Sequence, residues 1–361
     1  MNSKNIPSAN ILAVQPDIKW YNTSQNTFTL TTAEQLAGLS ELVNNGTDDF
    51  TGKTITLNCN IAINDKTYPT AWTWTPIGND AHPFNGTFDG IFDGNNYTIS
   101  GLYLTSFAIG TNSYFNCGGI FGVIGKTGVV KNLLVTDVTL KGKFDSFGAI
   151  AGKNLGKITE CQSTINIHEE TRQCDNTGGL VGTNNGEITL CYTTTNISDT
   201  EEGTHNTVGG LVGVNNGDIH KSYSKNHING NDYIGGLVGE NNGTIANCHT
   251  TGKIQGANYI GGISGRNNKT IENCYTDMFI DGNCYIGGIS GSNETGATIK
   301  KCYASRSAAG YPQKKGNITG YNIGTITPKR CRNNKVYKWD FLKIWTLDKY
   351  DRPRLRDLPM P

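Results

Sequence analysis

Apolar and polar residues alternate in short runs along most of this chain, and the order of the runs recurs. The stretch from Tyr233 to Asn258 reads YIGGLVGENNGTIANCHTTGKIQGAN, and the next 26 residues repeat the same order. Each unit has an apolar run broken by glycines, an Asn-Asn turn signal, and two further apolar runs that end in turns. Three short strands and three turns per unit predict one coil of a parallel β-helix.

One asparagine in each unit marks the repeat interval, with successive spacings of 30, 31, 26, 26, 26 and 29 residues. These asparagines are Asn154, Asn184, Asn215, Asn241, Asn267, Asn293 and Asn322. A nearly fixed period of this size is typical of a solenoid, in which neighbouring units bury apolar residues that one unit cannot cover. No repeat has the three-and-four spacing of a helical unit. We predict an all-β fold, a single right-handed parallel β-helix (β-solenoid) with about 26–31 residues per coil.

Several columns of equivalent residues are expected to stack from coil to coil. The first apolar column contains Leu180, Leu211, Leu237, Ile263, Ile289 and Ile318. The second contains Ile188, Ile219, Ile245, Ile271, Ile299 and Ile326. Because only some residues of a narrow coil point inward, a hydrophobic content of 36% is sufficient for such a core.

The repeats resemble the GLUG motif family. The resemblance lies in GGLVG at Gly178, Gly209 and Gly235 and in GGISG at Gly261 and Gly287, and it extends over about residues 20–356. It implies a β-solenoid of a bacterial surface or secreted protein, often an adhesin. The family has no agreed catalytic residues, so the resemblance implies none here.

Both ends of the solenoid are expected to be capped, because an open coil exposes backbone donors and acceptors. Thr31 to Glu34 predicts a capping box at the start of a helix, which should end near Asn44-Asn45-Gly46. Its apolar face comprises Leu36, Leu39, Leu42 and Val43. The predicted aromatic-rich C-terminal cap contains Trp339, Phe341, Ile344, Trp345 and Tyr350.

These features divide the chain into four parts. Residues 1–19 are predicted to be a flexible N-terminal segment, and residues 20–116 an N-terminal cap with the first coils. Residues 117–330 form the GLUG-type repeats, and residues 331–361 the C-terminal cap and basic tail.

The net charge of +1 conceals a division along the chain. From residue 298 onward there are 15 Lys and Arg against 4 Asp and Glu, which leaves 16 against 26 for residues 1–297. This bipolar charge could attract an anionic surface or join copies head to tail. Alternatively, it only keeps a terminal segment solvated.

Five cysteines occupy one repeat column, in which Ser222 replaces cysteine in a middle coil. They are Cys161, Cys191, Cys248, Cys274 and Cys302. In-register neighbours on parallel strands rarely have disulfide geometry, so we expect a ladder of small buried thiols. No CxxC pair is present, and we predict no metal and no cofactor.

The two longest repeats carry extra residues at the same point. These insertions bring together Glu169, Glu170, Asp175, Asp199, Glu201, Glu202 and His205, with His168 nearby. Insertions on one face of a repeat protein often form its binding face. The alternative is two solvated loops without a ligand.

Tyrosines form two further columns. One contains Tyr233, Tyr259 and Tyr285, and the other contains Tyr192, Tyr223, Tyr275 and Tyr303, interrupted by His249. Exposed aromatic rows can stack on sugar rings, whereas rings stacked on one another would only stabilise adjacent coils.

Little in the sequence indicates catalysis. The nearest match to a zinc protease motif, His168 to Arg172, lacks the second histidine. Asp89 and Asp93 are a candidate carboxylate pair, but each precedes a glycine and fits a turn.

We predict a non-catalytic, adhesin-like protein that binds a glycan or a surface protein of a host or bacterium. The alternatives are a carbohydrate-active enzyme on a β-helix and a structural subunit that assembles head to tail. We expect no specific nucleic acid, no transmembrane segment and no signal peptide in this chain, which we interpret as a mature fragment at the cell surface or outside the cell.

Overall fold

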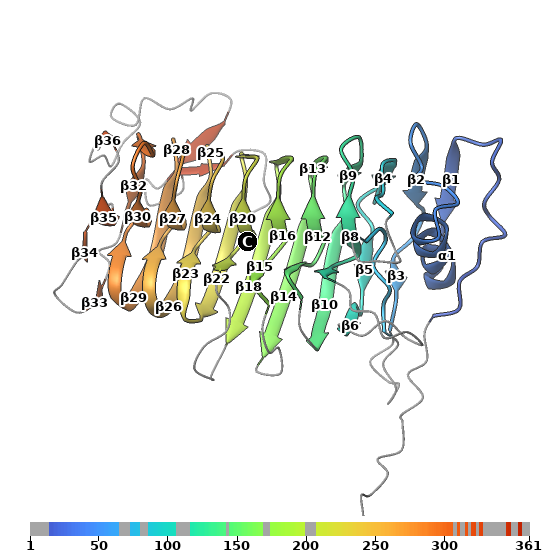
Figure 1. The fold of residues 1–361 in the computed structure, drawn as a ribbon, viewed down its shortest axis with the longest axis horizontal. Coiled ribbons are helices and arrows are strands. Elements are labelled where there is room, and N and C mark those ends of the chain that lie inside the picture. The colour runs from blue at the N-terminus through green and yellow to red at the C-terminus, as the bar shows by residue number, and fades with distance from the viewer. Residues whose placement is uncertain are drawn as a thin grey trace, which may run out of the picture.

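The computed structural model describes residues 14–64, 73–79, 86–105, 116–141, 144–168, 174–198 and 207–305, and short segments at 309–310, 315–316, 319–322, 325–327, 344–347 and 353–355. These residues form an elongated parallel β-solenoid whose coils follow one another along its long axis (Figure 1). Their strands make three parallel sheets of 11, 17 and 8 strands, together with one two-stranded antiparallel hairpin. The predicted all-β solenoid is confirmed.

Sheets 1 and 3 take at most one strand from each coil, whereas sheet 2 takes two strands from most coils or one long strand where the two are continuous. Sheet 1 contains β1 (Thr27–Leu30), β2 (Thr54–Leu57), β4 (Ile91–Asp93), β9 (Val129–Lys131), β13 (Lys157–Thr159), β17 (Glu187–Thr189), β21 (Asp218–His220), β25 (Thr244–Ala246), β28 (Thr270–Glu272), β31 (Thr298–Lys300) and β36 (Thr325–Thr327). Sheet 2 contains β3 (Ile61–Ala62), β5 (Thr98–Ser100), β6 (Tyr103–Thr105), β7 (Cys117–Gly118), β10 (Leu134–Lys141), β11 (Ser146–Gly148), β14 (Gln162–His168), β15 (Asn176–Gly178), β18 (Tyr192–Ser198), β19 (Thr207–Gly209), β22 (Tyr223–Asn229), β23 (Asp232–Gly235), β26 (His249–Gly261), β29 (Tyr275–Gly287), β32 (Tyr303–Ala304), β33 (Ala309–Gly310) and β34 (Lys315–Gly316). Sheet 3 contains β8 (Phe121–Ile124), β12 (Ala151–Asn154), β16 (Val181–Asn184), β20 (Val212–Asn215), β24 (Val238–Asn241), β27 (Ser264–Asn267), β30 (Ser290–Asn293) and β35 (Thr319–Asn322).

Equivalent residues of successive repeats are paired in register. In sheet 3, Asn215 pairs with Asn241 and Asn241 with Asn267, so one coil corresponds to 26 residues in this region. The coils with the insertions remain in register as well, because Asn154 pairs with Asn184. The predicted repeat interval is therefore the coil of the solenoid.

The two predicted apolar columns form the core wherever the structure describes their side chains. Leu180, Leu211, Leu237, Ile263 and Ile289 have no exposed surface, and the column from Ile188 to Ile299 is equally buried. The structure does not describe Ile318, and it describes the backbone but not the side chain of Ile326. Each side chain is covered by the same position of the coils above and below, roughly 4.8 Å away.

The repeat asparagines form a continuous, fully buried hydrogen-bonded row, which we call the inner ladder. From Asn154 to Asn267, each Nδ2 donates to the Oδ1 of the next coil over 2.7–2.9 Å, and Asn293 accepts the last of these bonds. Each Nδ2 also donates to the carbonyl oxygen two residues later in its own turn, as Asn215 does to Gly217 at 3.0 Å. The amides therefore satisfy buried backbone groups at one corner of every coil.

The glycines of the repeat mark points where no side chain fits. A Cβ on Gly235 would lie 1.7 Å from the carbonyl oxygen of Val238, and one on Gly236 would lie 2.2 Å from that of Gly262 in the next coil. A Cβ on Gly239 would lie 2.8 Å from the backbone nitrogen of Val208 in the preceding coil. The Gly-Gly-x-x-Gly pattern therefore reflects a tight bend and two close approaches between backbones.

A second corner is built on residues with positive φ. They are Asn132 (φ 53°), Glu160 (55°), Leu190 (54°), Lys221 (48°), Asn247 (56°), Asn273 (52°) and Lys301 (50°). This left-handed conformation is unfavourable for most residues, but asparagine tolerates it. Leucine, lysine and glutamate all occupy this corner, so the positive φ is imposed by the path of the coil and does not follow from local residue preference.

We expect Leu190→Asn to raise the free energy of unfolding by about 1 kcal/mol, because leucine loses more than asparagine in the left-handed conformation. Urea denaturation followed by circular dichroism would measure the change. The reverse substitution in the next coil but one, Asn247→Leu, is the matched control and should lower stability by a similar amount. A destabilised L190N or an unaffected N247L would contradict this account of the corner.

A helix lies at the N-terminal end of the solenoid, as predicted (Figure 1). Helix α1 (Ala33–Asn44) buries Leu36, Leu39, Leu42 and Val43, and it ends at the Asn45 cap. Its N-cap is Thr32, which accepts from the backbone of Gln35 at 3.2 Å.

The capping box is shifted by one residue from the prediction. Gln35 accepts from the backbone of Thr31 at 2.8 Å, so it takes the role that the sequence suggested for Glu34. Within the predicted N-terminal segment, the backbone N–H of Asp17 donates to the carbonyl of Glu34 at 2.8 Å. This bond ties the chain before β1 to the helix.

Part of the predicted C-terminal cap forms the hairpin of β37 (Trp345–Leu347) and β38 (Pro353–Leu355). Trp345 is fully buried in a cluster with Tyr275, and Tyr303, Ile344 and Leu355 pack against this pair. The hairpin therefore contacts the side of two coils, at sheet 2. Trp339, Phe341 and Tyr350 lie outside the described residues.

Candidate functional site

The two insertions leave sheet 2 from adjacent positions. His168, the last residue of β14, pairs with Ser198 at the end of β18, and on the return Asn176 pairs with Thr207. The ends of the two loops are therefore side by side, as expected from their place in the repeat. Of the predicted acidic group, Asp175 lies in the described part of the chain. The others, Glu169, Glu170, Asp199, Glu201, Glu202 and His205, lie outside it.

The column of Tyr233, Tyr259 and Tyr285 is a stack of parallel rings at the junction of sheets 2 and 3. The ring centroids are 4.8 Å and 4.5 Å apart, and both interplanar angles are 10°. All three residues have positive φ (47°, 56° and 55°) and are half-buried. Partial burial, and then the neighbouring tyrosines, raise the pKa of Tyr259. Its hydroxyl therefore remains protonated well above neutral pH.

The second aromatic column lies on sheet 2 and is more buried. Neighbouring rings from Tyr192 to Tyr303 have centroids 5.0–5.8 Å apart, and His249 continues the stack between Tyr223 and Tyr275. Tyr223, His249 and Tyr275 are at most 4% exposed. This column is therefore part of the packing of the molecule and offers no open row of rings to a ligand.

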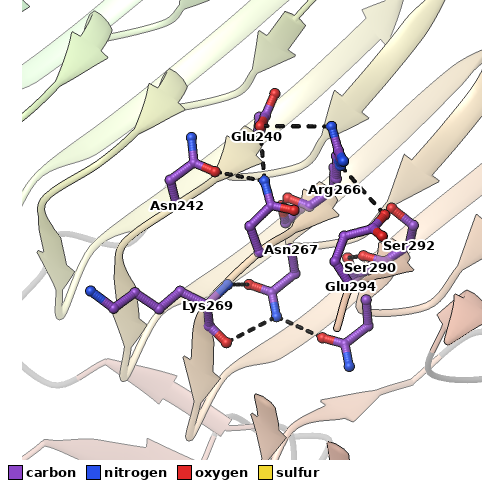
Figure 2. Close-up of polar contacts among 11 residues, drawn as sticks. Glu240, Asn242, Arg266, Asn267, Lys269, Ser290, Ser292 and Glu294 are labelled. Atoms are coloured by element: carbon purple, nitrogen blue, oxygen red, sulfur yellow. Dashed lines mark hydrogen bonds and ion pairs between the residues drawn. The ribbon is translucent and has the colours of Figure 1, made fainter. Parts of the chain in front are cut away.

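Next to the tyrosine stack, charged residues of successive coils form a cluster on the outer side of sheet 3 (Figure 2). Arg266 in β27 lies 3.4 Å from a carboxylate oxygen of Glu294 and 4.0 Å from one of Glu240 in β24. The charge of Glu294 raises the pKa of Tyr259 and that of Arg266 lowers it, so both charged groups lie near the tyrosine stack. All three charged side chains are partly exposed, at 23–37% of their surface.

A second asparagine row follows the first, one residue later in each coil. Asn216, Asn242 and Asn268 each donate to the Oδ1 of the preceding coil, over 2.8, 3.0 and 2.6 Å. This outer ladder, which begins at Asn185, is joined to the charged cluster because Asn268 also donates to Glu240 at 2.9 Å. Its bonds run opposite to those of the inner ladder.

Together these groups make a continuous surface that we call the Tyr–Asn strip. It comprises the tyrosine stack (Tyr233, Tyr259, Tyr285), the charged cluster (Glu240, Arg266, Glu294) and the outer ladder (Asn185, Asn216, Asn242, Asn268). The tyrosine column was predictable from the sequence, whereas the other two groups were not predicted. The doubled asparagine of four successive repeats, from Asn184-Asn185 to Asn267-Asn268, was the signal for the outer ladder, whereas nothing in the spacing distinguished the charged cluster.

The cysteine column has a structural role. The Sγ atoms of Cys161, Cys191, Cys248, Cys274 and Cys302 lie 3.2–3.3 Å from the carbonyl oxygen two residues earlier, and each thiol donates to it. Ser222 makes the same bond to His220 at 2.9 Å. No disulfide joins the cysteines that the structure describes. The ladder of buried thiols is confirmed, and it satisfies carbonyl groups beside the positive-φ corner.

We expect the column thiols of the native protein to resist alkylation at pH 8. Burial, and then the adjacent thiols, raise the pKa of Cys161 and Cys274 well above the ordinary range, so little reactive thiolate forms. Cys59 and Cys284 are half-buried and serve as controls in the same sample. Peptide mapping after iodoacetamide treatment should find label on these two and none on Cys161 or Cys274 until the protein is unfolded. Rapid labelling of the column in folded protein would contradict the burial.

A buried thiol outside the column, that of Cys174, makes stability depend on pH. Burial raises the pKa of Cys174 to about 12, whereas an unfolded cysteine titrates near pH 8.5. Because the folded state holds its protons more tightly, this stabilisation is complete below about pH 8.5 and is lost as pH rises further. Urea midpoints should therefore fall between pH 8.5 and pH 10, and Cys174→Ser should reduce the fall.

Asp89 and Asp93 connect neighbouring coils. Asp89 accepts from Thr87 at 2.6 Å and from the backbone of Thr127 at 3.0 Å. Asp93 accepts from Asn132 at 3.0 Å and pairs with Lys131 at 3.0 Å. Partial burial alone would raise the pKa of each carboxyl, but the hydrogen bonds outweigh it and lower both pKa values. These residues therefore act as structural acceptors, as the turn interpretation predicted.

Two further properties concern the described residues only. They contain no group of three or more His, Cys, Asp or Glu side chains placed to hold a metal ion. They also contain no helix with the length and apolarity needed to cross a membrane.

Comparison with known proteins agrees with the repeat pattern. The family described as "The GLUG motif" matches residues 230–255, so the chain carries the motif that its sequence predicted. A "Putative Gly-rich membrane protein" of Evansella cellulosilytica is 37% identical over 87 residues. The match covers 24% of this chain and 9% of that protein, so the chain spans a small part of this relative. A crystal structure of "a putative immunoglobulin A1 protease from Bacteroides ovatus" is similar over 93% of both chains, at 15% identity and a TM-score of 0.49.

Proposed function

We propose that this chain is a non-catalytic β-solenoid of a surface or secreted protein and that it binds a glycan on the Tyr–Asn strip. The observation that carries the proposal is the strip itself. It presents tyrosine hydroxyls and asparagine amides at the same positions of successive coils, with two carboxylates between them, beside a buried inner ladder that fixes their spacing. Such a row can form many hydrogen bonds to a polyhydroxylated ligand without moving.

The composition of the strip favours a glycan over a protein. Protein interfaces need buried apolar or aromatic anchors at their centre. Among the described residues, the large hydrophobic side chains that are exposed are Ile18, Ile91 and Phe279, and none of them belongs to the strip. Apart from the three tyrosine rings, the strip therefore consists of charged and hydrogen-bonding groups, which suit a polyhydroxylated ligand.

The absence of catalysis is part of the proposal. Asp89 and Asp93, the carboxylate pair that the sequence suggested, are held by structural hydrogen bonds and have lowered pKa values. A glycosidase needs one carboxyl group with a raised pKa to act as an acid. In the strip, the carboxylates of Glu240 and Glu294 both lie beside Arg266.

Affinity electrophoresis through gels that contain a panel of polysaccharides, with product analysis of the same samples, tests the proposal. At least one polysaccharide should retard the protein without being cleaved, and Tyr259→Phe combined with Asn242→Ala should weaken the retardation several-fold. Glu187→Gln is the control, because Glu187 is exposed on sheet 1 and pairs with Lys157.

Three outcomes would contradict the proposal. Cleavage products would show an enzyme, and retardation by no member of the panel would remove the glycan. Retardation that survives the strip variant but is lost when the two insertions are shortened would place the binding site at the acidic loops.

A further inference from the structure

We infer that the ligand is an uncharged linear polysaccharide that lies along the solenoid axis, with about one sugar unit per coil, and that the edges of the side chains bind it. This inference rests on the proposed function and specifies its ligand. It is drawn from the orientation of the tyrosine rings, the period of the strip and the balance of its charges.

The stacking of the tyrosines closes both faces of the central ring to a sugar. The ring of Tyr259 lies between those of Tyr233 and Tyr285. Its centroid is 4.8 Å and 4.5 Å from theirs, and both interplanar angles are 10°. Both faces of the central ring are therefore occupied by protein. Along its side, the stack offers a ligand a row of ring edges and hydroxyl groups, and the hydroxyl groups can form hydrogen bonds.

The period of the strip restricts the shape of the ligand. The coils carrying Tyr233, Tyr259 and Tyr285 follow one another at 26 residues without an insertion, so the row is straight and repeats at roughly 4.8 Å. An extended peptide along this row repeats at about 3.3 Å per residue, or twice that for side chains on one face, and falls out of step within a few coils. A pyranose chain linked across its rings advances by close to one coil per unit, with alternate units turned over, so each of the three coils of the stack meets one sugar.

The charges favour a neutral chain. Near the stack lie the carboxylates of Asp232, Glu240 and Glu294 and the guanidinium group of Arg266. Arg266 is already engaged by both glutamates, so no unpaired guanidinium is left for a uronate or a sulfate. An anionic polymer would therefore be weakly repelled.

Isothermal titration calorimetry of the intact chain with neutral oligosaccharides tests the inference. The probes are cello- and xylo-oligosaccharides from the disaccharide to the octasaccharide, with oligogalacturonates as the anionic series. Affinity should rise about fivefold for each added unit and level off once the chain spans the strip, since each unit adds hydrogen bonds. Tyr259→Phe, which keeps the stack but removes the central hydroxyl, should weaken the longer chains more than the shortest ones.

The outcomes separate the inference from the proposed function. Equal affinity for short and long neutral chains would overturn the inference while leaving a glycan-binding protein, because recognition would then involve one unit or a chain end. Preferential binding of oligogalacturonates would overturn the inference that the ligand is uncharged. If polysaccharide gels retard the protein but no soluble oligosaccharide of any length binds, the alignment along the axis is wrong. Failure of both kinds of ligand would overturn the proposed function as well.

Discussion

Gly235→Ala is expected to destabilise the protein by more than about 3 kcal/mol, the largest effect of any single methyl group added to the repeat. The new Cβ would lie 1.7 Å from the carbonyl oxygen of Val238, 2.5 Å from its carbonyl carbon and 2.9 Å from the carbonyl oxygen of Ile263. These are backbone atoms of two stacked coils, so neither can move without breaking the register of sheet 3. Urea denaturation followed by circular dichroism would measure the loss.

Gly230→Ala is the matched control in the same coil. A Cβ there would meet only the side chain of Ile234, at 3.2 Å, and the backbone of Gly230 does not have positive φ. Its effect should stay within about 0.5 kcal/mol, as for a surface substitution. A G235A variant as stable as G230A would show that the bend at Gly235 can relax, and the steric explanation of the motif would then fail.

Asn241→Asp should destabilise the protein by about 3–5 kcal/mol at neutral pH, because it buries a charge without a partner. Asn241 has no exposed surface and donates to Asn267 at 2.8 Å and to the carbonyl of Gly243 at 3.0 Å. A carboxylate has the same shape but no hydrogen to donate, so acceptors would face acceptors. Chemical denaturation at several pH values would measure the loss.

Asn242→Asp provides the control, because it makes the same change in the next residue, on the partly exposed outer ladder. We expect it to cost less than about 1 kcal/mol. For Asn241→Asp the buried carboxyl should hold its proton more tightly than in the unfolded chain. The loss of unfolding free energy in N241D should therefore be smallest below about pH 4 and should grow as pH rises. Equal losses at the two positions would mean that the inner ladder contributes no more than surface hydrogen bonds.

Much of the fold could be predicted from the sequence because stacking repeats the same requirement in every coil. Leu237 and Ile245 are buried in each copy of the repeat, so their columns are visible as a period. The positive-φ corner could not be predicted in this way. Glu160, Leu190 and Lys221 share no chemical property, and the coil imposes their conformation against local preference.

The candidate site was harder to predict because it depends on orientation. The spacing of Tyr233, Tyr259 and Tyr285 predicted a column but left open whether ring faces or edges would be exposed. Their positive φ angles direct the rings against one another, and that conformation is not encoded by tyrosine itself. The pairing of Arg266 with two glutamates similarly required knowledge of which strands are neighbours.

The first asparagine of the inner ladder bears on how this protein could have gained coils during evolution. Asn154, the first amide in the row, stands beside Ile124, and its Oδ1 already accepts from the backbone of Gly156 at 3.2 Å. A single asparagine is therefore largely satisfied within its own turn, and each further one adds a bond to an amide that exists already. Duplication of the DNA for one coil would thus give a viable chain at every copy number, with no need for a partner mutation to arise at the same time.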